Sequence, residues 1–332
     1  MEESFFNIGI IYRNNTWWNI DYICSVLKQH SNKVNFRIFD VTEFNIDNFP
    51  NNLDGITLLP TESDVVEPIL EKNLSCKWIH CMWSGVDKLL NIPHIMEKDI
   101  CLTNGRGWNS KSLAEYSIFS MLYFSYNLQK YIQVFNQKGW YKPLNQMINQ
   151  KTLTIVGYGL NGVEIAKKAK LGFDMKVIGI KKNIQLVEGK EYIDKITTID
   201  KLQDIIPVSD YIINILPGTK ETENLWDNKL FSLMKSTAVF INLSRGSSVN
   251  EEHLIQVLKE KKILGAALEV FKQEPLSSDS EFYKLENVIL SFHSCGNTIE
   301  YFKQGVEVFI NNLNSYEKTG KFLTIVDKIK GY

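Results

Sequence analysis

The sequence lacks a strong charge of either sign, a long apolar run and a basic, apolar leader, and each absence excludes a class of protein. Its 37 Lys and Arg residues balance 38 Asp and Glu residues, which leaves a formal charge of -1 at pH 7. A near-neutral chain has no global field that would attract nucleic acid or anionic lipid. No stretch reaches the roughly 18 uninterrupted apolar residues of a membrane span, and the opening Met1-Glu-Glu-Ser4 does not resemble a secretion signal. We therefore expect a cytoplasmic protein that binds neither nucleic acid nor membranes.

Cysteine is also scarce, and its spacing excludes two common uses. The five cysteines are an odd number, and none of them forms a CxxC pair. This pattern argues against a disulfide framework and against a zinc site, so we expect reduced thiols and no bound metal. The hydrophobic content of 44% and charged content of 23% are ordinary for globular proteins, and 332 residues suit two domains.

Short apolar and β-branched runs alternate with helical or loop segments along the chain. This alternation is typical of α/β domains in which helices cover both faces of a parallel sheet. The expected strands are residues 8–11, 36–39, 55–59, 78–82 and 100–103 in a first unit, then 153–156, 176–180, 211–216, 238–243, 265–270 and 288–291 in a second. A buried helix is expected over residues 112–130 and another over 300–315, the latter packing on the first unit. We therefore predict a discontinuous domain, residues 1–103 plus 296–332, around a second domain at residues 104–295.

A glycine-rich turn follows the first strand of the second unit. The spacing G-x-G-x-x-G has a mechanical reason in a strand-turn-helix that binds a dinucleotide. Its first glycine permits the tight turn, its second lets the backbone approach a pyrophosphate, and its third allows close packing of helix on strand. The alternative is a purely structural turn. The expected cofactor contacts here are Gly157, Tyr158, Gly159, Leu160, Asn161 and Gly162.

The end of the next strand bears on the choice of cofactor. NAD-binding proteins usually carry an Asp or Glu there, which accepts hydrogen bonds from the ribose hydroxyls. This chain has Lys181, Lys182 and Asn183 and no carboxylate. Two ammonium groups would attract the 2′-phosphate of NADP, so we expect NADPH to be preferred, with NADH possible. The alternative is that the two lysines form an ordinary solvated turn.

Three later strand ends carry polar residues in the order Arg245, Glu274 and His293. In a doubly wound sheet the carboxyl ends of the strands face the ligand crevice, so these side chains can converge near a nicotinamide. A guanidinium offers a planar fork that matches a carboxylate. An imidazole can protonate the alkoxide formed when hydride reaches a ketone, and a neighbouring carboxylate would stabilise the imidazolium. Each residue alone would more often be structural, and the joint pattern is what favours catalysis.

The order and spacing of these motifs resemble the D-isomer-specific 2-hydroxyacid dehydrogenase family over nearly the whole chain. The resemblance implies two doubly wound parallel-sheet domains, with a Rossmann cofactor domain inserted in a flavodoxin-like substrate domain. It also implies that Arg245 holds the substrate carboxylate and carbonyl, that His293 donates the proton and that Glu274 pairs with His293. Trp83, Ser84 and Gly85 resemble the substrate-carboxylate loop of the family. The further cofactor contacts that the resemblance implies are Leu216, Pro217, Thr222, Leu243, Ser244, Arg245, Glu269 and His293.

The resemblance further implies a homodimer formed through the cofactor domain and a small 2-oxo acid as substrate. Residues 139–144 resemble a segment of the glyoxylate and hydroxypyruvate reductases. Two positions depart from the family: Glu269 stands where Asp is usual, and Phe292 replaces the Pro before the histidine. Three alternatives stay open: an NAD-linked D-lactate or phosphoglycerate dehydrogenase, a cofactor-sensing protein like the corepressors of the family, and, least favoured, a purely structural role.

Overall fold

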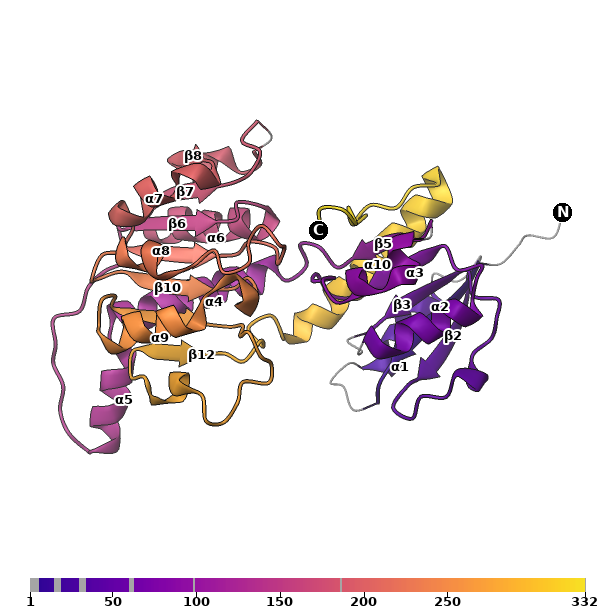
Figure 1. The fold of residues 1–332 in the computed structure, drawn as a ribbon, viewed down its shortest axis with the longest axis horizontal. Coiled ribbons are helices and arrows are strands. Elements are labelled where there is room, and N and C mark those ends of the chain that lie inside the picture. The colour runs from indigo at the N-terminus through magenta and orange to yellow at the C-terminus, as the bar shows by residue number, and fades with distance from the viewer. Residues whose placement is uncertain are drawn as a thin grey trace. The chain divides into compact units, whose positions relative to one another are not determined.

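The computed structural model describes residues 6–14, 19–29, 34–59, 63–97, 99–185 and 187–331. The chain divides into two compact units, one formed by Met1–Trp108 with Thr298–Tyr332 and the other by Asn109–Asn297 (Figure 1). Throughout these described ranges, no helix is both long enough and apolar enough to cross a membrane.

The first unit contains a five-stranded parallel sheet. Its strands lie in the order β2-β1-β3-β4-β5, which is the flavodoxin-like order and confirms the predicted fold class. The strands are β1 (Phe6–Tyr12), β2 (Val34–Asp40), β3 (Gly55–Leu58), β4 (Trp78–Cys81) and β5 (Cys101–Asn104). The helices are α1 (Ile20–Lys28), α2 (Val66–Lys72), α3 (Pro93–Glu97) and α10 (Ile299–Thr319).

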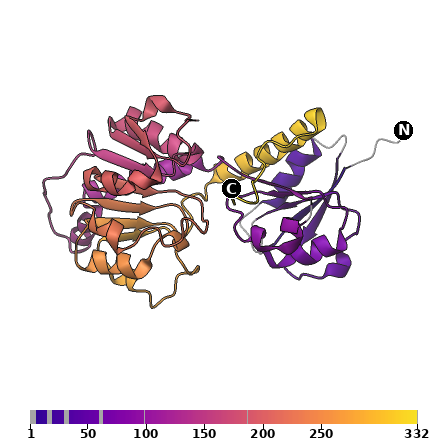
Figure 2. The same ribbon diagram turned by 45° about the horizontal axis from the view of Figure 1, so that its top comes forward.

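Each face of this sheet buries its own apolar cluster. One cluster includes residues of α2 and α3, and the other includes residues of α1 and α10. The C-terminal helix α10 is the long yellow helix of Figure 2. Phe309 of this helix stacks on Trp78 of β4 with ring centroids 5.3 Å apart. The helix ends at Gly320, which adopts the left-handed conformation that stops a helix.

The second unit contains a seven-stranded parallel sheet in the order β12-β11-β10-β9-β6-β7-β8. Counted from β6 this is the Rossmann order extended by one strand. The strands are β6 (Thr152–Val156), β7 (Lys176–Ile180), β8 (Lys195–Thr197), β9 (Tyr211–Asn214), β10 (Val239–Asn242), β11 (Gly265–Leu268) and β12 (Val288–Leu290). The sequence predicted six of these strands and missed β8, because three half-exposed residues at a sheet edge carry no apolar run.

Successive strand residues of this sheet point to opposite faces, as the period of a strand requires. Ile155 belongs to the cluster under α4 and α6, whereas Val156 belongs to the cluster under α7, α8 and α9. The helices are α4 (Ser110–Ser125), α5 (Leu128–Asn136), α6 (Leu160–Phe173), α7 (Leu202–Ile205), α8 (Asn228–Ser232) and α9 (Glu251–Lys259).

The prediction of one helix over residues 112–130 was wrong. The helix is interrupted between α4 and α5 at Asn127, which has a φ of 49° in the left-handed region. Asparagine tolerates this conformation better than most residues, so the break needs neither glycine nor proline. The segment after α5 runs along the outside of the seven-stranded sheet without regular structure (Figure 1).

Candidate active site

The three glycines of the turn after β6 stand in three different environments. Gly157 has a φ of +115°, and a Cβ there would lie 2.6 Å from the Ile215 carbonyl oxygen. A Cβ on Gly162 would lie 2.8 Å from the Gly157 carbonyl oxygen, so this glycine lets α6 approach the turn. A Cβ on Gly159, by contrast, would meet nothing within 4 Å. Open space at the amino end of α6, bounded by a tight turn, fits the pyrophosphate of a dinucleotide.

The other residues of this turn divide between core and surface. Tyr158 is buried, and its hydroxyl donates to the Gly189 carbonyl at 2.9 Å. Burial, together with the smaller effect of the Glu191 charge, raises the pKa of Tyr158 to about 12. The Asn161 side chain accepts a hydrogen bond from the Ser110 hydroxyl of α4 at 2.5 Å. Leu160 is exposed. The Tyr158 side chain is therefore part of the core, and any contact with a cofactor at this position would come from its backbone.

The lysine pair follows β7 at the same edge of the sheet. The Lys182 ammonium lies 2.8 Å from a carboxylate oxygen of Glu221, with both side chains largely exposed. The Lys181 backbone N–H donates to the Thr197 carbonyl at 3.0 Å, which ties this residue to the end of β8. Asn183 accepts from the Gln185 N–H at 2.9 Å and so closes a turn on itself. Glu221 lies 39 residues from Lys182 along the chain, so the sequence around the lysines gives no sign of this contact.

The loop after β9 is braced by side chains that the sequence had placed against the cofactor. The Thr222 hydroxyl donates to the Pro217 carbonyl at 2.8 Å, and the Ser244 hydroxyl donates to the Leu216 carbonyl at 2.6 Å. Leu243 is buried and belongs to the cluster under α4 and α6. These residues therefore hold the loops beside the glycine turn in place.

Arg245 begins the loop after β10. Its Nη1 donates to the Ser244 carbonyl at 2.9 Å, and a Cβ on Gly218 would lie 2.8 Å from its Cγ. The next residue, Gly246, lies so close to the loop after β11 that a Cβ would sit 1.9 Å from the Phe271 carbonyl carbon. Only glycine allows this approach, which brings the Arg245 loop against the loop that carries Glu274.

Glu274 and His293 form a direct pair. His293 Nδ1 lies 2.7 Å from Glu274 Oε2, while Oε1 of the same carboxylate accepts the Phe271 N–H at 2.9 Å. Burial alone would raise the pKa of Glu274, but the His293 and Phe271 hydrogen bonds and the charges of His293 and Arg245 lower it overall. Glu274 is therefore ionised at neutral pH, and the His293 ring is about half exposed at 49%, within reach of a small molecule.

Glu269 is the most buried acid of the site, with only 4% of its surface exposed. Its Oε1 accepts the Cys295 N–H at 2.8 Å, and its Oε2 accepts the Ser291 hydroxyl. Burial raises the pKa of Glu269 above its usual range. The expected contact of Glu269 with the nicotinamide remains a prediction, and the structure directs both carboxylate oxygens into the His293 loop.

The predicted substrate loop lies in the first unit and is braced from three directions. The Ser84 hydroxyl donates to the Gly105 carbonyl at 3.1 Å and accepts the Trp108 indole N–H at 3.2 Å. The backbone carbonyl of Ser84 accepts the Asn104 side-chain amide at 2.6 Å. Trp83 and Gly85 are half-buried. This bracing fixes the loop, and its contact with a substrate carboxylate remains a prediction.

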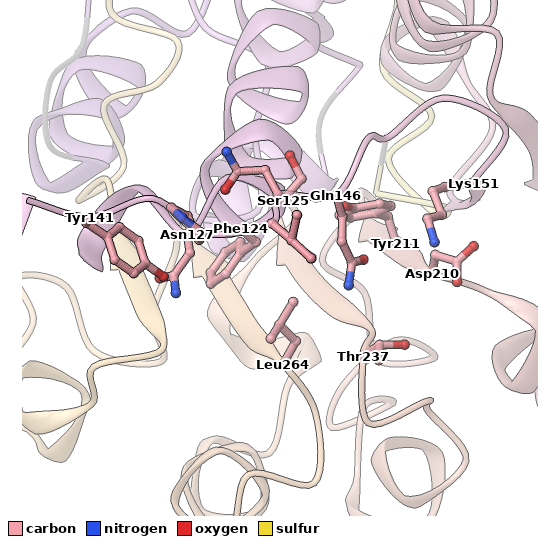
Figure 3. A pocket seen from close by; sticks show the side chains of 13 residues that line it. Phe124, Ser125, Asn127, Tyr141, Gln146, Lys151, Asp210, Tyr211, Thr237 and Leu264 are labelled. Carbon is pink, nitrogen blue, oxygen red and sulfur yellow. The ribbon is translucent and has the colours of Figure 1, made fainter. Parts of the chain in front are cut away.

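A cavity of about 160 Å³ lies in the second unit at the opposite edge of the sheet (Figure 3). Its walls include Lys151, Asp210, Thr237 and Leu264, which stand just before strands β6, β9, β10 and β11. The glycine turn and the catalytic candidates follow the carboxyl ends of strands. The cavity in Figure 3 is therefore separate from the candidate active site.

One group of potential metal ligands was missed by the sequence analysis. Within the part of the chain that the structure describes, ligand atoms of Glu67, Glu71 and His94 lie within 4.8 Å of one another. His94 Nδ1 lies 2.5 Å from Glu67 Oε1, so a hydrogen bond between α2 and α3 accounts for most of this cluster. No spacing in the sequence signals it, since His94 lies 27 residues from Glu67 along the chain.

Comparison with known proteins places this geometry in a family. Residues 118–295 match the model of the D-isomer specific 2-hydroxyacid dehydrogenase NAD binding domain. A glyoxylate reductase of Thermococcus litoralis is 31% identical over 80% of this chain and 81% of its own length. A probable 2-ketogluconate reductase of Dictyostelium discoideum is 37% identical over 53% of this chain, and the chain spans about half (53%) of that relative.

Solved structures show the same fold. A D-isomer specific 2-hydroxyacid dehydrogenase family protein from Aeromonas salmonicida superposes with a TM-score of 0.84 at 25% identity, over 97% of this chain and 99% of that one. A glyoxylate/hydroxypyruvate reductase from Sinorhizobium meliloti in complex with NADP and sulfate superposes with a TM-score of 0.82 at 20% identity, over 98% of this chain and 100% of that one. The chain belongs to the D-isomer specific 2-hydroxyacid dehydrogenase family of NAD(P)-dependent oxidoreductases.

Proposed function

We propose that this protein reduces a small 2-oxo acid to the corresponding 2-hydroxy acid, with NADPH as the preferred reductant. The observation that carries the proposal is the His293–Glu274 pair at 2.7 Å, with Arg245 on the neighbouring loop. This pair and the open glycine turn both follow carboxyl ends of strands in one parallel sheet, which is where such sheets bind ligands.

Each catalytic candidate has a role that its chemistry supports. Arg245 binds the substrate carboxylate through its guanidinium, whose planar fork matches the two carboxylate oxygens. His293 donates a proton to the oxygen of the ketone as that oxygen gains negative charge. Glu274 orients the ring through Nδ1, which leaves Nε2 for the substrate, and it stabilises the protonated imidazole. The bound NADPH supplies the hydride.

The preference for NADPH rests on the charge at the end of β7. Lys181 and Lys182 stand where an acid would reject a 2′-phosphate, and an ammonium group binds phosphate as a point charge. The Lys182–Glu221 ion pair weakens this attraction, because both side chains are exposed and the pair must open for Lys182 to bind phosphate. We therefore expect a preference of about tenfold rather than an absolute selection.

The proposed substrate class is a small 2-oxo acid such as glyoxylate or hydroxypyruvate. Relatives named glyoxylate reductase support this size class, although their identity of about 31% leaves the side chains around the substrate free to differ. Residues 139–144, which resemble a segment of the glyoxylate and hydroxypyruvate reductases, point the same way.

An absorbance assay at 340 nm tests the proposal. NADPH and NADH oxidation should be followed with glyoxylate, hydroxypyruvate, pyruvate and a bulkier 2-oxo acid. We expect His293→Gln and Arg245→Gln each to lower kcat/KM by roughly a hundredfold or more while NADPH still binds. His253→Gln is a matched control, because His253 lies on α9 and its Nδ1 accepts the Asn228 N–H at 3.1 Å, outside the candidate site. Wild-type rates in either catalytic variant would refute the assignment.

A second candidate, an NAD-linked dehydrogenase of the same class, is favoured by one observation. The end of β7 carries no acid, but the Glu221 carboxylate beside Lys182 supplies one where the adenosine ribose of the cofactor would lie. Faster oxidation of NADH than of NADPH in the same assay would select this alternative. Tight NADPH binding with no turnover of any acid would instead select a cofactor-sensing protein.

We also propose a homodimer formed through the cofactor domain. None of the α5 residues is buried, although the helix carries Leu128, Ile132 and Phe135 on its apolar side. Trp140 and Leu144, which follow α5, are 91% and 101% exposed. A contiguous apolar segment of this kind is typical of an interface. Sedimentation should give twice the 38.4 kDa chain mass, and Phe135→Asp should shift the protein toward the monomer.

A further inference from the structure

The loop that carries His293 adopts an unfavourable backbone conformation. Phe292 and His293 have φ values of 52° and 55°, so two consecutive residues other than glycine lie in the left-handed region. Such a conformation is unfavourable for residues with a Cβ and persists only where surrounding contacts hold it. The family's usual proline before the histidine is absent, so its fixed backbone angle does not stiffen this loop.

Glu269 supplies contacts on both sides of the strained pair. Its Oε2 accepts the hydroxyl of Ser291, the residue before the pair. Its Oε1 accepts the N–H of Cys295, two residues after the pair, at 2.8 Å. Its backbone carbonyl accepts the His293 N–H at 2.6 Å. Glu269, directly after β11, therefore makes hydrogen bonds to the loop before, at and after His293.

The surroundings favour this arrangement. Glu269 is 4% exposed, so its carboxylate must find partners inside the protein, and hydrogen bonds to a charged group are stronger than neutral ones. The groups that face it are the Ser291 hydroxyl, the Cys295 thiol and N–H, the Tyr116 hydroxyl of α4 and, more remotely, His293. Burial raises the pKa of Tyr116 to about 12, and burial with the Glu269 charge raises the pKa of Cys295, so both stay protonated at neutral pH.

We propose that Glu269 is a positioning residue, whose side chain holds the His293 loop in its strained conformation by bridging Ser291 and Cys295. This inference rests on the proposed function, in which His293 donates the proton. Glu has one more methylene than the Asp that is usual in the family. This extra length lets the carboxylate contact both Ser291 and Cys295. Its action on the reaction passes through the geometry of His293.

Two substitutions separate reach from charge. Glu269→Gln keeps the length of the side chain and removes its charge. The amide oxygen can accept the Cys295 N–H, and the amide N–H₂ can donate to the Ser291 oxygen. Glu269→Asp keeps the charge but draws the carboxylate back by about 1.5 Å, which lengthens the 2.8 Å contact with Cys295 beyond hydrogen-bond range. If the bridge is what holds the loop, Gln should preserve the slow hydrogen exchange of residues 291–295 and Asp should not.

The test combines steady-state kinetics, NADPH binding by fluorescence and hydrogen exchange of the 291–295 amides. We expect Glu269→Asp to lower kcat by roughly tenfold and to speed exchange at His293 and Cys295 by roughly tenfold, with little change in the Kd for NADPH. Glu269→Gln should keep the exchange of these amides within about threefold of wild type, because it keeps both contacts of the bridge. Ser291→Ala, which removes one of the two donors, should fall between them.

The reverse order would overturn the inference. If Glu269→Gln loses activity while Glu269→Asp retains it, the charge acts directly and the bridge is incidental. Unchanged exchange in Glu269→Asp would also overturn it, since the loop would then be held without the bridge. Hydrogen exchange needs no turnover, so a wild-type protein that reduces no 2-oxo acid would refute the proposed function and still leave the bridge testable.

Discussion

Alanine at Gly159 should separate cofactor binding from folding. Gly159 caps α6 with a φ of -106°, a conformation open to any residue, and its Cβ would meet nothing within 4 Å. Gly→Ala at such a site gains about 0.4–1 kcal/mol from the unfolded state and loses a few tenths to about 1 kcal/mol as a helix cap. The two effects offset, so we expect the free energy of unfolding to change by less than about 0.5 kcal/mol.

The same methyl group should obstruct the cofactor. The open space above Gly159 is where the pyrophosphate would approach the backbone, and overpacking of a fitted contact costs about 1–3 kcal/mol. Since 1.4 kcal/mol is a factor of ten in affinity, the Kd for NADPH should rise by about 5- to 150-fold.

The neighbouring glycines provide matched contrasts. Gly157→Ala must accommodate a φ of +115° and a Cβ 2.6 Å from the Ile215 carbonyl oxygen, which together should cost about 2–6 kcal/mol of stability. Gly162→Ala gains up to about 1 kcal/mol of helix propensity, but its Cβ would lie 2.8 Å from the Gly157 carbonyl oxygen. Overpacking against backbone should outweigh that gain and leave a net loss of about 1–2 kcal/mol.

Urea unfolding and NADPH fluorescence titration of the three variants test this reasoning together. Gly159→Ala should unfold like the wild type and bind weakly, whereas Gly157→Ala and Gly162→Ala should both be less stable. Wild-type affinity in Gly159→Ala would show that no phosphate approaches this backbone. If Gly159→Ala lost as much stability as Gly157→Ala, the inference that a Cβ on Gly159 meets no neighbouring atom would be wrong.

Three further substitutions test other parts of the structure. Burial lowers the pKa of His80 to about 3, so between pH 6.5 and 3 only the unfolded state takes up its proton, and stability falls with falling pH. Urea unfolding at pH 7.5 and 5 should show a loss that is about 2 kcal/mol smaller in His80→Gln than in the wild type; equal losses would contradict it. Gly246→Ala, whose Cβ would lie 1.9 Å from the Phe271 carbonyl carbon, should abolish turnover and lower the melting temperature by several degrees; wild-type melting would refute the close approach. Glu274→Gln keeps an acceptor for the Phe271 N–H but loses the charge beside His293, so kcat should fall roughly a hundredfold with melting little changed; a wild-type kcat would exclude Glu274 from the proton transfer.

Most of the fold could be predicted from the sequence because buried parallel strands are short apolar runs, and those runs are local. Both sheets and their faces follow from such runs. The failures occurred where no local signal exists. The edge strand β8 is short and half-exposed, and the break at Asn127 depends on a single left-handed residue. A continuous apolar pattern passes through that break, so periodicity alone predicted one helix.

The candidate site was predictable to the extent that it depends on strand ends. A parallel sheet brings the ends of β6, β10, β11 and β12 to one edge, so Arg245, Glu274 and His293 could be grouped from their positions alone. The roles of the supporting residues could not be read in this way, because they depend on side-chain length and on contacts between loops far apart in the chain. Tyr158 lies in the glycine turn and yet is buried, with its hydroxyl bonded to Gly189, 31 residues away.

The partner of Lys182 shows what this limit means for specificity. From the sequence, two lysines without a nearby acid indicate a positive site for a 2′-phosphate. In the folded chain Glu221 returns a carboxylate to Lys182 from 39 residues away, at 2.8 Å. Since a largely exposed pair is worth at most about 1 kcal/mol, it should reduce the proposed preference for NADPH without reversing it. If NADPH is preferred as proposed, Glu221 weakens that preference, and Glu221→Gln should raise the NADPH-to-NADH ratio of kcat/KM by up to about fivefold. An unchanged ratio in that variant would show that the ion pair does not compete with the cofactor.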